Sequence, residues 1–149
     1  MRHRYSRQRL SAVSALTVSP IRHRLGLYFR FHPNNIRSAE VMAFLEDLLG
    51  HIRGTILLLW DANPPHRSRT TQQFLAQHPR LRVERFPGYA PELNPDEQVW
   101  TQLKRAVANG TPPGLRELAT MLHRTIGRLR RSQRLLLSCI RGSELPWTW

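Results

Sequence analysis

The sequence predicts an α/β fold in which a mixed β-sheet is flanked by helices. Residues 25–31 place apolar side chains at every second position, which is typical of a half-buried strand. Residues 55–60 form a continuous apolar run of strand length, and such a run suits a strand covered on both faces. Residues 115–129 repeat leucine and isoleucine at helical spacing. Strands interspersed with amphipathic helices favour the α/β class.

The first part of the chain predicts a β-hairpin followed by a helix. Residues 10–18 alternate small and apolar side chains up to Ser19-Pro20, so we expect a strand that pairs with residues 25–31 through a turn. A helix should then begin with Ser38 as its N-cap and end near Gly50.

The second part predicts a strand at residues 55–60, which ends abruptly at Asp61. Further elements are expected as a short helix over 70–77, a strand over 81–86, a rigid loop over 87–91, a helix capped by Asn94 and running to Ala108, and an amphipathic helix over 115–129. The expected order is therefore β-β-α-β-α-β-α-α.

Composition restricts the class of protein. The 149 residues include 23 Lys and Arg against 10 Asp and Glu, which gives a net charge of +13, and Lys104 is the single lysine. The one cysteine, Cys139, excludes an internal disulfide framework and a multi-cysteine zinc site. No apolar run approaches the roughly 20 residues that span a bilayer, and no secretory signal follows Met1. We expect a soluble cytoplasmic protein whose partner is a polyanion, although a solvated surface is the default for any single arginine.

Two acidic residues stand where a sheet enzyme places its ligands. Asp61 follows a buried strand, and the carboxyl ends of such strands are where ligand sites form. Glu97 lies in the first turn of a helix. A turn-forming aspartate and an acid favoured by the helix dipole are the alternatives. Taken together, two such carboxylates are suited to hold a divalent metal for displacement at phosphorus.

Two motifs contain these acids and resemble a known family. The first is Leu58-Leu59-Trp60-Asp61-Ala62-Asn63-Pro64-Pro65-His66-Arg67-Ser68, and the second runs from Phe86-Pro87-Gly88-Tyr89-Ala90-Pro91 through Glu92-Leu93-Asn94-Pro95-Asp96-Glu97-Gln98-Val99-Trp100 to Leu103-Lys104. Both resemble the catalytic domain of mariner-like transposases of bacterial insertion sequences, in the DDE endonuclease superfamily. In this chain 35 residues separate Asp61 from Glu97, within the range usual for that family. The chain departs from the family motifs at two positions. Asn63 follows Asp61 by two places, whereas the family's asparagine follows its aspartate directly, and Ala90 stands where serine is usual.

The resemblance implies a ribonuclease H-like fold and a site with two metal ions, Mg²⁺ or Mn²⁺, held by Asp61 and Glu97. It implies cleavage of DNA at the ends of a mobile element and transfer of the resulting 3′-OH to target DNA. His66 and Lys104 match family positions and are expected to contact substrate, with a loop-stabilising histidine and a solvated lysine as the alternatives. Arg67 and Arg105 are candidates for contacts to the DNA backbone. Trp100 and Tyr89 are candidates for base stacking, and a core role is the better interpretation of Trp100.

The family requires a third carboxylate, from an aspartate on its first and central strand. Residues 1–39 contain no Asp or Glu. The predicted hairpin occupies the place of the family's second and third strands, so we expect the first strand to precede residue 1. The chain is then the C-terminal part of a transposase, from a truncated or split reading frame, and is expected to be inactive alone.

The expected organisation has three parts: a loose basic edge over 1–8, the catalytic domain over 9–131 and a tail over 132–149. The expected partners are double-stranded DNA at the element ends and target, with a second copy or the upstream half of a split transposase, in the bacterial nucleoid. The alternatives are a non-catalytic basic nucleic-acid-binding protein and an RNA-associated basic protein.

Overall fold

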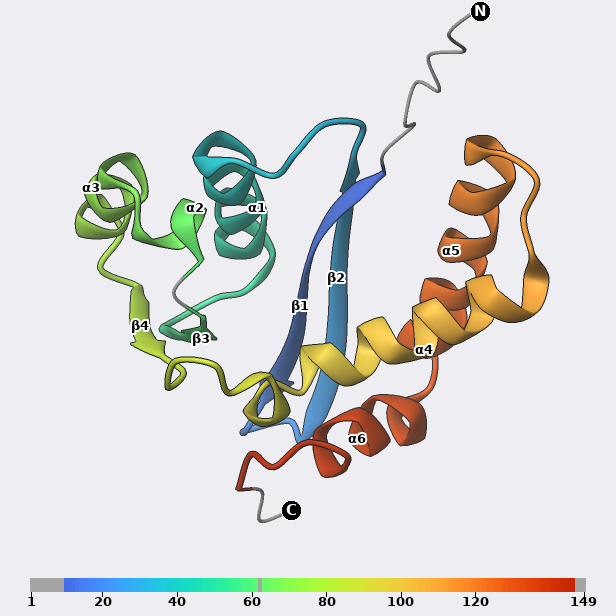
Figure 1. Cartoon of the computed structure of the whole chain (residues 1–149). Helices are drawn as coiled ribbons and strands as arrows, with labels where there is room; N and C mark the ends of the chain where they lie inside the picture. The colour runs from blue at the N-terminus through green and yellow to red at the C-terminus, as the bar shows by residue number, and fades with distance from the viewer. Residues whose placement is uncertain (1–9, 62, 147–149) are drawn as a thin grey trace, which may run out of the picture.

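The computed structural model describes residues 10–61 and 63–146 of the chain. The elements in chain order are β1 (Ser11–Ser19), β2 (Arg24–His32), α1 (Ser38–His51), β3 (Ile56–Trp60), α2 (Pro64–Arg67), α3 (Arg69–Gln77), β4 (Leu81–Arg85), the 3-10 turn η1 (Pro91–Leu93), α4 (Asp96–Gly110), α5 (Leu115–Arg130) and α6 (Gln133–Arg141). Figure 1 shows the β1–β2 hairpin at the centre, with α1, α2 and α3 on one side and α4, α5 and α6 on the other. The expected loose edge at 1–8 and the tryptophans at 147 and 149 lie outside the described residues.

The two N-terminal strands form the predicted hairpin. β1 and β2 pair antiparallel from Ser11 opposite His32 to Ser19 opposite Arg24. Leu25 and Leu27 are buried on one face of the hairpin, whereas Tyr28 lies on the other. The period of two read from the sequence therefore gives the hairpin two apolar faces, and a separate core forms on each.

The first core lies between one face of the hairpin and the three C-terminal helices. It contains Leu25, Leu27, Val99, Leu103, Leu122, Ile126, Leu129, Leu136, Cys139 and Ile140. Burying this apolar surface is the main stabilising contribution from this side of the molecule.

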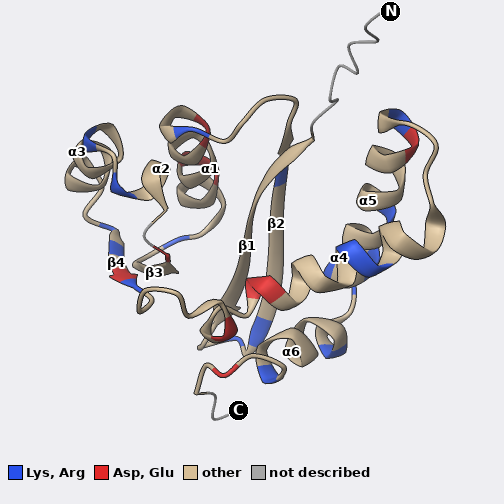
Figure 2. Ribbon diagram, in the orientation of Figure 1, with Lys and Arg blue, Asp and Glu red and all other residues tan. Residues whose placement is uncertain are grey.

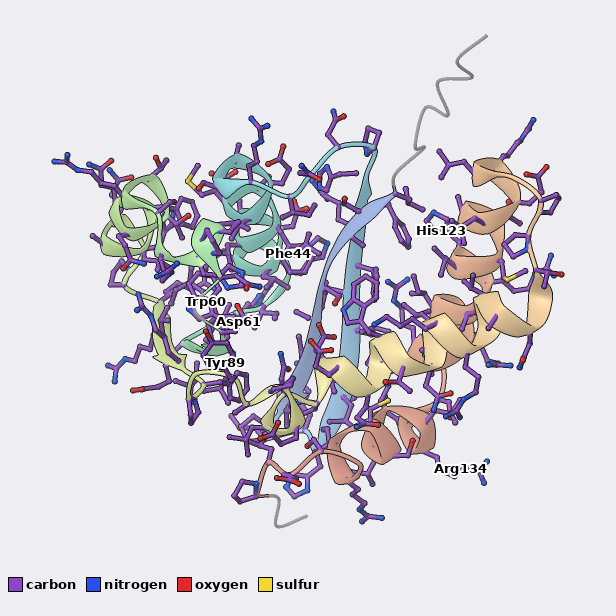
Figure 3. All side chains as sticks on the ribbon, viewed as in Figure 1. Phe44, Trp60, Asp61, Tyr89, His123 and Arg134 are labelled. Carbon is purple, nitrogen blue, oxygen red and sulfur yellow. The ribbon has the colours of Figure 1, made fainter. Side chains whose placement is uncertain are left out.

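The second core lies on the opposite face of the hairpin and joins α1 to the second pair of strands. It contains Val41, Phe44, Leu45, Leu48, Trp60, Phe74 and Leu81. Figure 3 shows Phe44 and Trp60 on this side, and His123 on the side of α5. The hairpin thus separates the two cores.

Helix α1 begins differently from the prediction. Its N-cap is Arg37, whose backbone N–H donates to the Glu40 carboxylate at 2.9 Å. The Ser38 hydroxyl instead donates to the Ser68 hydroxyl at 2.6 Å. The predicted Ser38 N-cap is wrong because a tertiary contact with the start of α3 uses that side chain.

Strand β3 is the predicted apolar strand, and it pairs parallel with β4 from Ile56 opposite Leu81 to Trp60 opposite Arg85. One face of β3 packs into the second core. The side chains on the other face are exposed, Leu57 by 62% and Leu59 by 40%. The expectation of a strand covered on both faces is therefore wrong for the described residues, because no described element covers Leu57 and Leu59.

The strands form two separate two-stranded sheets, β1–β2 and β3–β4. Within the described ranges, β1 pairs only with β2, and β3 pairs only with β4. Strands β1 and β3 therefore each keep one edge without a ladder partner. We call the space between these two edges the β1–β3 interval. Unpaired backbone edges are normally covered or blocked in folded proteins.

The packed core extends beyond residue 131, where the sequence placed the end of the domain. α6 contacts β2 and α4, and Leu136, Cys139 and Ile140 are buried in the first core. Cys139 is a free thiol buried in this core. In the part of the chain that the structure describes, no helix is long and apolar enough to cross a membrane.

Replacing Leu136 by alanine should lower the free energy of unfolding by about 2–5 kcal/mol, because its side chain is fully buried and would leave a cavity. Ile21→Ala is the control, since Ile21 is 93% exposed and the change should stay within about 0.5 kcal/mol. Urea unfolding followed by circular dichroism measures both. Equal effects of the two variants would contradict the assignment of α6 to the core.

Candidate active site

Asp61 lies directly after β3, and its side chain is 47% exposed. Its Oδ1 accepts from the Asn63 backbone N–H at 3.0 Å, and its Oδ2 accepts from the Asn63 amide at 3.0 Å. Asn63 also precedes the first residue of α2. The turn-forming role that the sequence left open for Asp61 is therefore present, and the carboxylate still reaches solvent.

His66 holds the same loop from the other side. Its Nδ1 lies 2.9 Å from Asp61 Oδ1 and 3.1 Å from the Asp61 carbonyl oxygen. Its ring stacks on Trp60, with centroids 4.2 Å apart and planes at 5°. Packing on a buried tryptophan fixes the orientation of the imidazole. His66 therefore positions Asp61. This corresponds to the loop-stabilising role that the sequence left open as the alternative to a substrate contact.

Glu97 lies in the first turn of α4 and is exposed. The start of this helix is built by Asn94, whose side-chain oxygen accepts from the Asp96 N–H at 3.1 Å. The Asn94 carbonyl oxygen accepts from the Glu97 N–H at 3.1 Å. The helix starts one residue later than predicted, with Pro95 as its N-cap and Asp96 as its first residue, and the two hydrogen bonds to Asn94 set the position of Glu97 on the helix.

Asp96, which sequence reasoning left out, attaches this helix start to the hairpin. Ser14 Oγ on β1 donates to Asp96 Oδ2 at 2.5 Å, while Asp96 Oδ1 is buried with no hydrogen-bond partner among the described residues. Burial raises the pKa of Asp96 from 3.8 to about 6; Glu97 adds to the rise, and hydrogen bonds with Ser14 and Trp100 oppose it. No signal in the sequence marks this residue, because nothing local shows that it faces β1.

The two predicted metal ligands are attached to different parts of the fold. Asp61 follows β3, whereas the Ser14–Asp96 hydrogen bond holds the start of α4 on β1. Across residues 10–61 and 63–146, no three His, Cys, Asp or Glu side chains lie close enough together to hold a metal ion. Carboxylate oxygens are the ligands that Mg²⁺ and Mn²⁺ prefer, but these two alone do not make a complete set.

The other predicted substrate residues lie on the surface of two elements. Arg67 is the last residue of α2, Lys104 and Arg105 lie on α4, and all three are exposed. Trp100 packs against the first core with its ring centroid 5.3 Å from that of Phe29, so its core role is confirmed. Tyr89 is fully exposed with a left-handed φ of 55°.

The fold is that of a ribonuclease H-like catalytic domain. The chain matches the catalytic domain of Mos1 mariner transposase with a TM-score of 0.54 and 15% sequence identity, covering 92% of this chain and 83% of that one. A structure of the Mos1 transposase catalytic domain with Raltegravir and Mn matches with a TM-score of 0.50 and 14% identity, covering 93% of this chain and 84% of that one. The predicted fold class is confirmed, with its strands in two small sheets.

The family follows from the sequence itself. A family model for DDE superfamily endonucleases matches residues 2–118. The chain therefore belongs to the DDE superfamily endonucleases, which confirms the predicted family and class of enzyme. No curated protein sequence matches the chain.

The buried carboxyl of Asp96 should make stability depend on pH. Its pKa is higher in the folded chain than in the unfolded one, so the folded state binds the proton more tightly between about pH 4 and pH 6. The free energy of unfolding should fall as pH rises through this window, by about 3 kcal/mol at most. Asp96→Asn stays neutral and should remove that fall, so the variant is more stable than the parent at pH 7.5.

Urea unfolding at pH 4, 5, 6 and 7.5 measures this difference. Asp47→Asn is the matched control, because Asp47 is partly exposed and pairs with Arg30 at the surface. An identical pH slope for the parent and Asp96→Asn would show that this carboxyl ionises normally.

Proposed function

We propose that the chain is the catalytic part of a DNA transposase that cleaves and joins DNA phosphodiesters with divalent metal. The observation that carries the proposal is the carboxylate of Asp61, held half-exposed at the end of β3 by Asn63 and His66 in a chain of the DDE family. The Mos1 catalytic domain solved with Mn supports the choice of metal.

In this proposal Asp61 and Glu97 are the metal ligands of this chain. When bound, Mg²⁺ or Mn²⁺ supplies charge stabilisation at phosphorus and a more acidic attacking water or hydroxyl. Asn63 and His66 orient the Asp61 carboxylate. Asn94 and the Ser14–Asp96 hydrogen bond fix the helix start that bears Glu97. Lys104, Arg67 and Arg105 are exposed cations for phosphate contacts.

We further infer that the active form contains one more strand, in the β1–β3 interval, and that this strand supplies a third carboxylate. The inner edges of β1 and β3 both lack a ladder partner in the described ranges, and Leu57 and Leu59 leave apolar surface exposed beside them. Residues 1–39 contain no acid that could serve instead. The strand would come from upstream sequence or from a second polypeptide, as in a truncated or split element.

A nicking assay on supercoiled plasmid in Mg²⁺ tests both parts. The 149-residue chain alone should show no Mg²⁺-dependent nicking. A version extended at its N-terminus by an added strand that bears an aspartate should nick. Asp61→Asn, Glu97→Gln and Asn at the added aspartate should each reduce nicking by at least about a hundredfold, because each removes a metal ligand.

If the 149-residue chain nicks DNA by itself and Asp61→Asn abolishes that nicking, the added strand is not needed. The transposase proposal would then still stand. Nicking by the extended chain that survives Asp61→Asn and Glu97→Gln would overturn the assignment of both ligands. An extended chain that folds, shown by an increased urea midpoint, and still does not nick would overturn the catalytic proposal.

A second candidate is a basic nucleic-acid-binding module without catalysis. The observation that favours it is that both oxygens of Asp61 already accept hydrogen bonds from the loop. It expects Asp61→Ala and Glu97→Ala to leave DNA affinity unchanged or raised and Mn²⁺ binding undetectable. Calorimetric titration of Mn²⁺ into the extended chain and both variants separates the two candidates.

A further inference from the structure

One face of α5 carries a row of arginines that the proposed active site does not use. Arg116, Arg124 and Arg128 lie on α5 and Arg131 is its C-cap residue; all four are exposed and recur at helical spacing. We call these four residues the α5 arginine row. The opposite side of the same helix is buried in the first core through Leu122, Ile126 and Leu129, so the row faces away from the core.

Among the described residues the row forms no ion pair, although Glu117 lies beside Arg116 and Arg124 on the same surface. Within residues 10–61 and 63–146, none of its four guanidinium groups has an ion pair or hydrogen bond to another residue. Arg130 differs, because its Nε donates to the Leu27 carbonyl oxygen at 2.9 Å and joins α5 to β2. Glu117 is the single acid on α5 and lies in its first turn, where the helix dipole favours a carboxylate.

Such an arrangement costs stability in the free chain. Arg124 and Arg128 are four residues apart and Arg128 and Arg131 three, so their like charges lie on neighbouring turns and repel. A polyanion laid along the helix would remove this repulsion. Guanidinium groups also suit phosphate oxygens, because their planar fork donates two hydrogen bonds at once.

The length of the row fits duplex DNA. Arg131 lies fifteen residues after Arg116, a separation of about 22 Å along the helix axis at roughly 1.5 Å per residue. One strand of B-DNA places about six phosphates over that length, at roughly 3.4 Å per nucleotide. The basic surface continues on α6, where Arg134 projects outward (Figure 3). Figure 2 shows the Lys and Arg residues of α4, α5 and α6 together on this side of the hairpin.

We propose that the α5 arginine row is a DNA-backbone contact surface, on the side of the hairpin opposite to Asp61. The surface holds the duplex by phosphate contacts without reading base sequence. The choice of DNA as the polyanion rests on the proposed function, whereas the location of the surface rests on α5 itself.

The test is binding of a fluorescent 30-base-pair duplex to the full chain in EDTA, where no cleavage occurs. Arg124→Gln, Arg128→Gln and Arg131→Gln are combined in one triple variant, and affinity is measured by anisotropy from 50 to 200 mM salt. Loss of three phosphate contacts should make the slope of log affinity against log salt shallower by about 2.7. Over that salt range the parent should then lose about 40-fold more affinity than the variant.

The matched control combines Arg22→Gln, Arg53→Gln and Arg82→Gln, three exposed arginines that are not part of α5 or of the proposed active site. It should keep the slope of the parent. A second triple, with lysine at 124, 128 and 131, retains the charge and should also keep most of the slope. The melting temperature of the glutamine triple should equal or exceed that of the parent, because like-charge repulsion is removed.

Equal slope changes in the glutamine triple and the control triple would overturn the proposal in favour of diffuse charge. An unchanged slope in the glutamine triple would also overturn it. If that variant does not fold, the single variants Arg124→Gln and Arg128→Gln should each change the slope by about 0.9, and no change in either would overturn the proposal. If the parent bound duplex RNA more tightly than duplex DNA, and the glutamine triple lost that binding, DNA would be overturned as the partner. The assay contains no divalent metal and measures binding alone, so failure of the catalytic proposal leaves this result interpretable.

Discussion

Alternation of side chains along the β1–β2 hairpin is the constraint on which the rest of the fold depends. Leu25 and Leu27 face the C-terminal helices, and Tyr28 faces α1, so one pair of strands supports two cores. The two candidate carboxylates lie on or directly after elements that pack into different cores. Asp61 follows a strand of the second, and Glu97 lies on a helix that Ser14 and Asp96 attach to the hairpin beside the first. Their relative position is therefore set by the way the hairpin packs into both cores.

Local pattern was enough to predict most of the elements and the family. The period of two in β2 and the apolar run in β3 depend only on neighbouring residues, so both strands were found with ends close to those observed. The motif from Tyr89 to Lys104 indicated the family by resemblance, and within it the Asn94 side chain accepts a hydrogen bond from the Asp96 N–H at the start of α4.

The errors arise where distant residues decide the outcome. Ser38 looks like an N-cap, but Ser68, thirty residues further along, takes its hydroxyl, and Arg37 caps the helix instead. Residues 133–141 looked like a tail, because their burial depends on a contact with β2 more than a hundred residues earlier. Asp96 was missed for the same reason: only the approach of Ser14 makes its carboxyl buried. Two interpretations of His66 are equally open from the sequence, and stacking on Trp60 supports the structural one.

The exposed face and free edge of β3 have a consequence for the chain in solution. Ile56–Trp60 is five apolar residues without a charge, a proline or a glycine, and Leu57 and Leu59 are uncovered beside an edge that offers backbone groups for pairing. Segments of this kind join with copies of themselves into intermolecular sheets. A neighbouring strand that pairs with this edge would cover its backbone groups and so lower the tendency of the chain to self-associate.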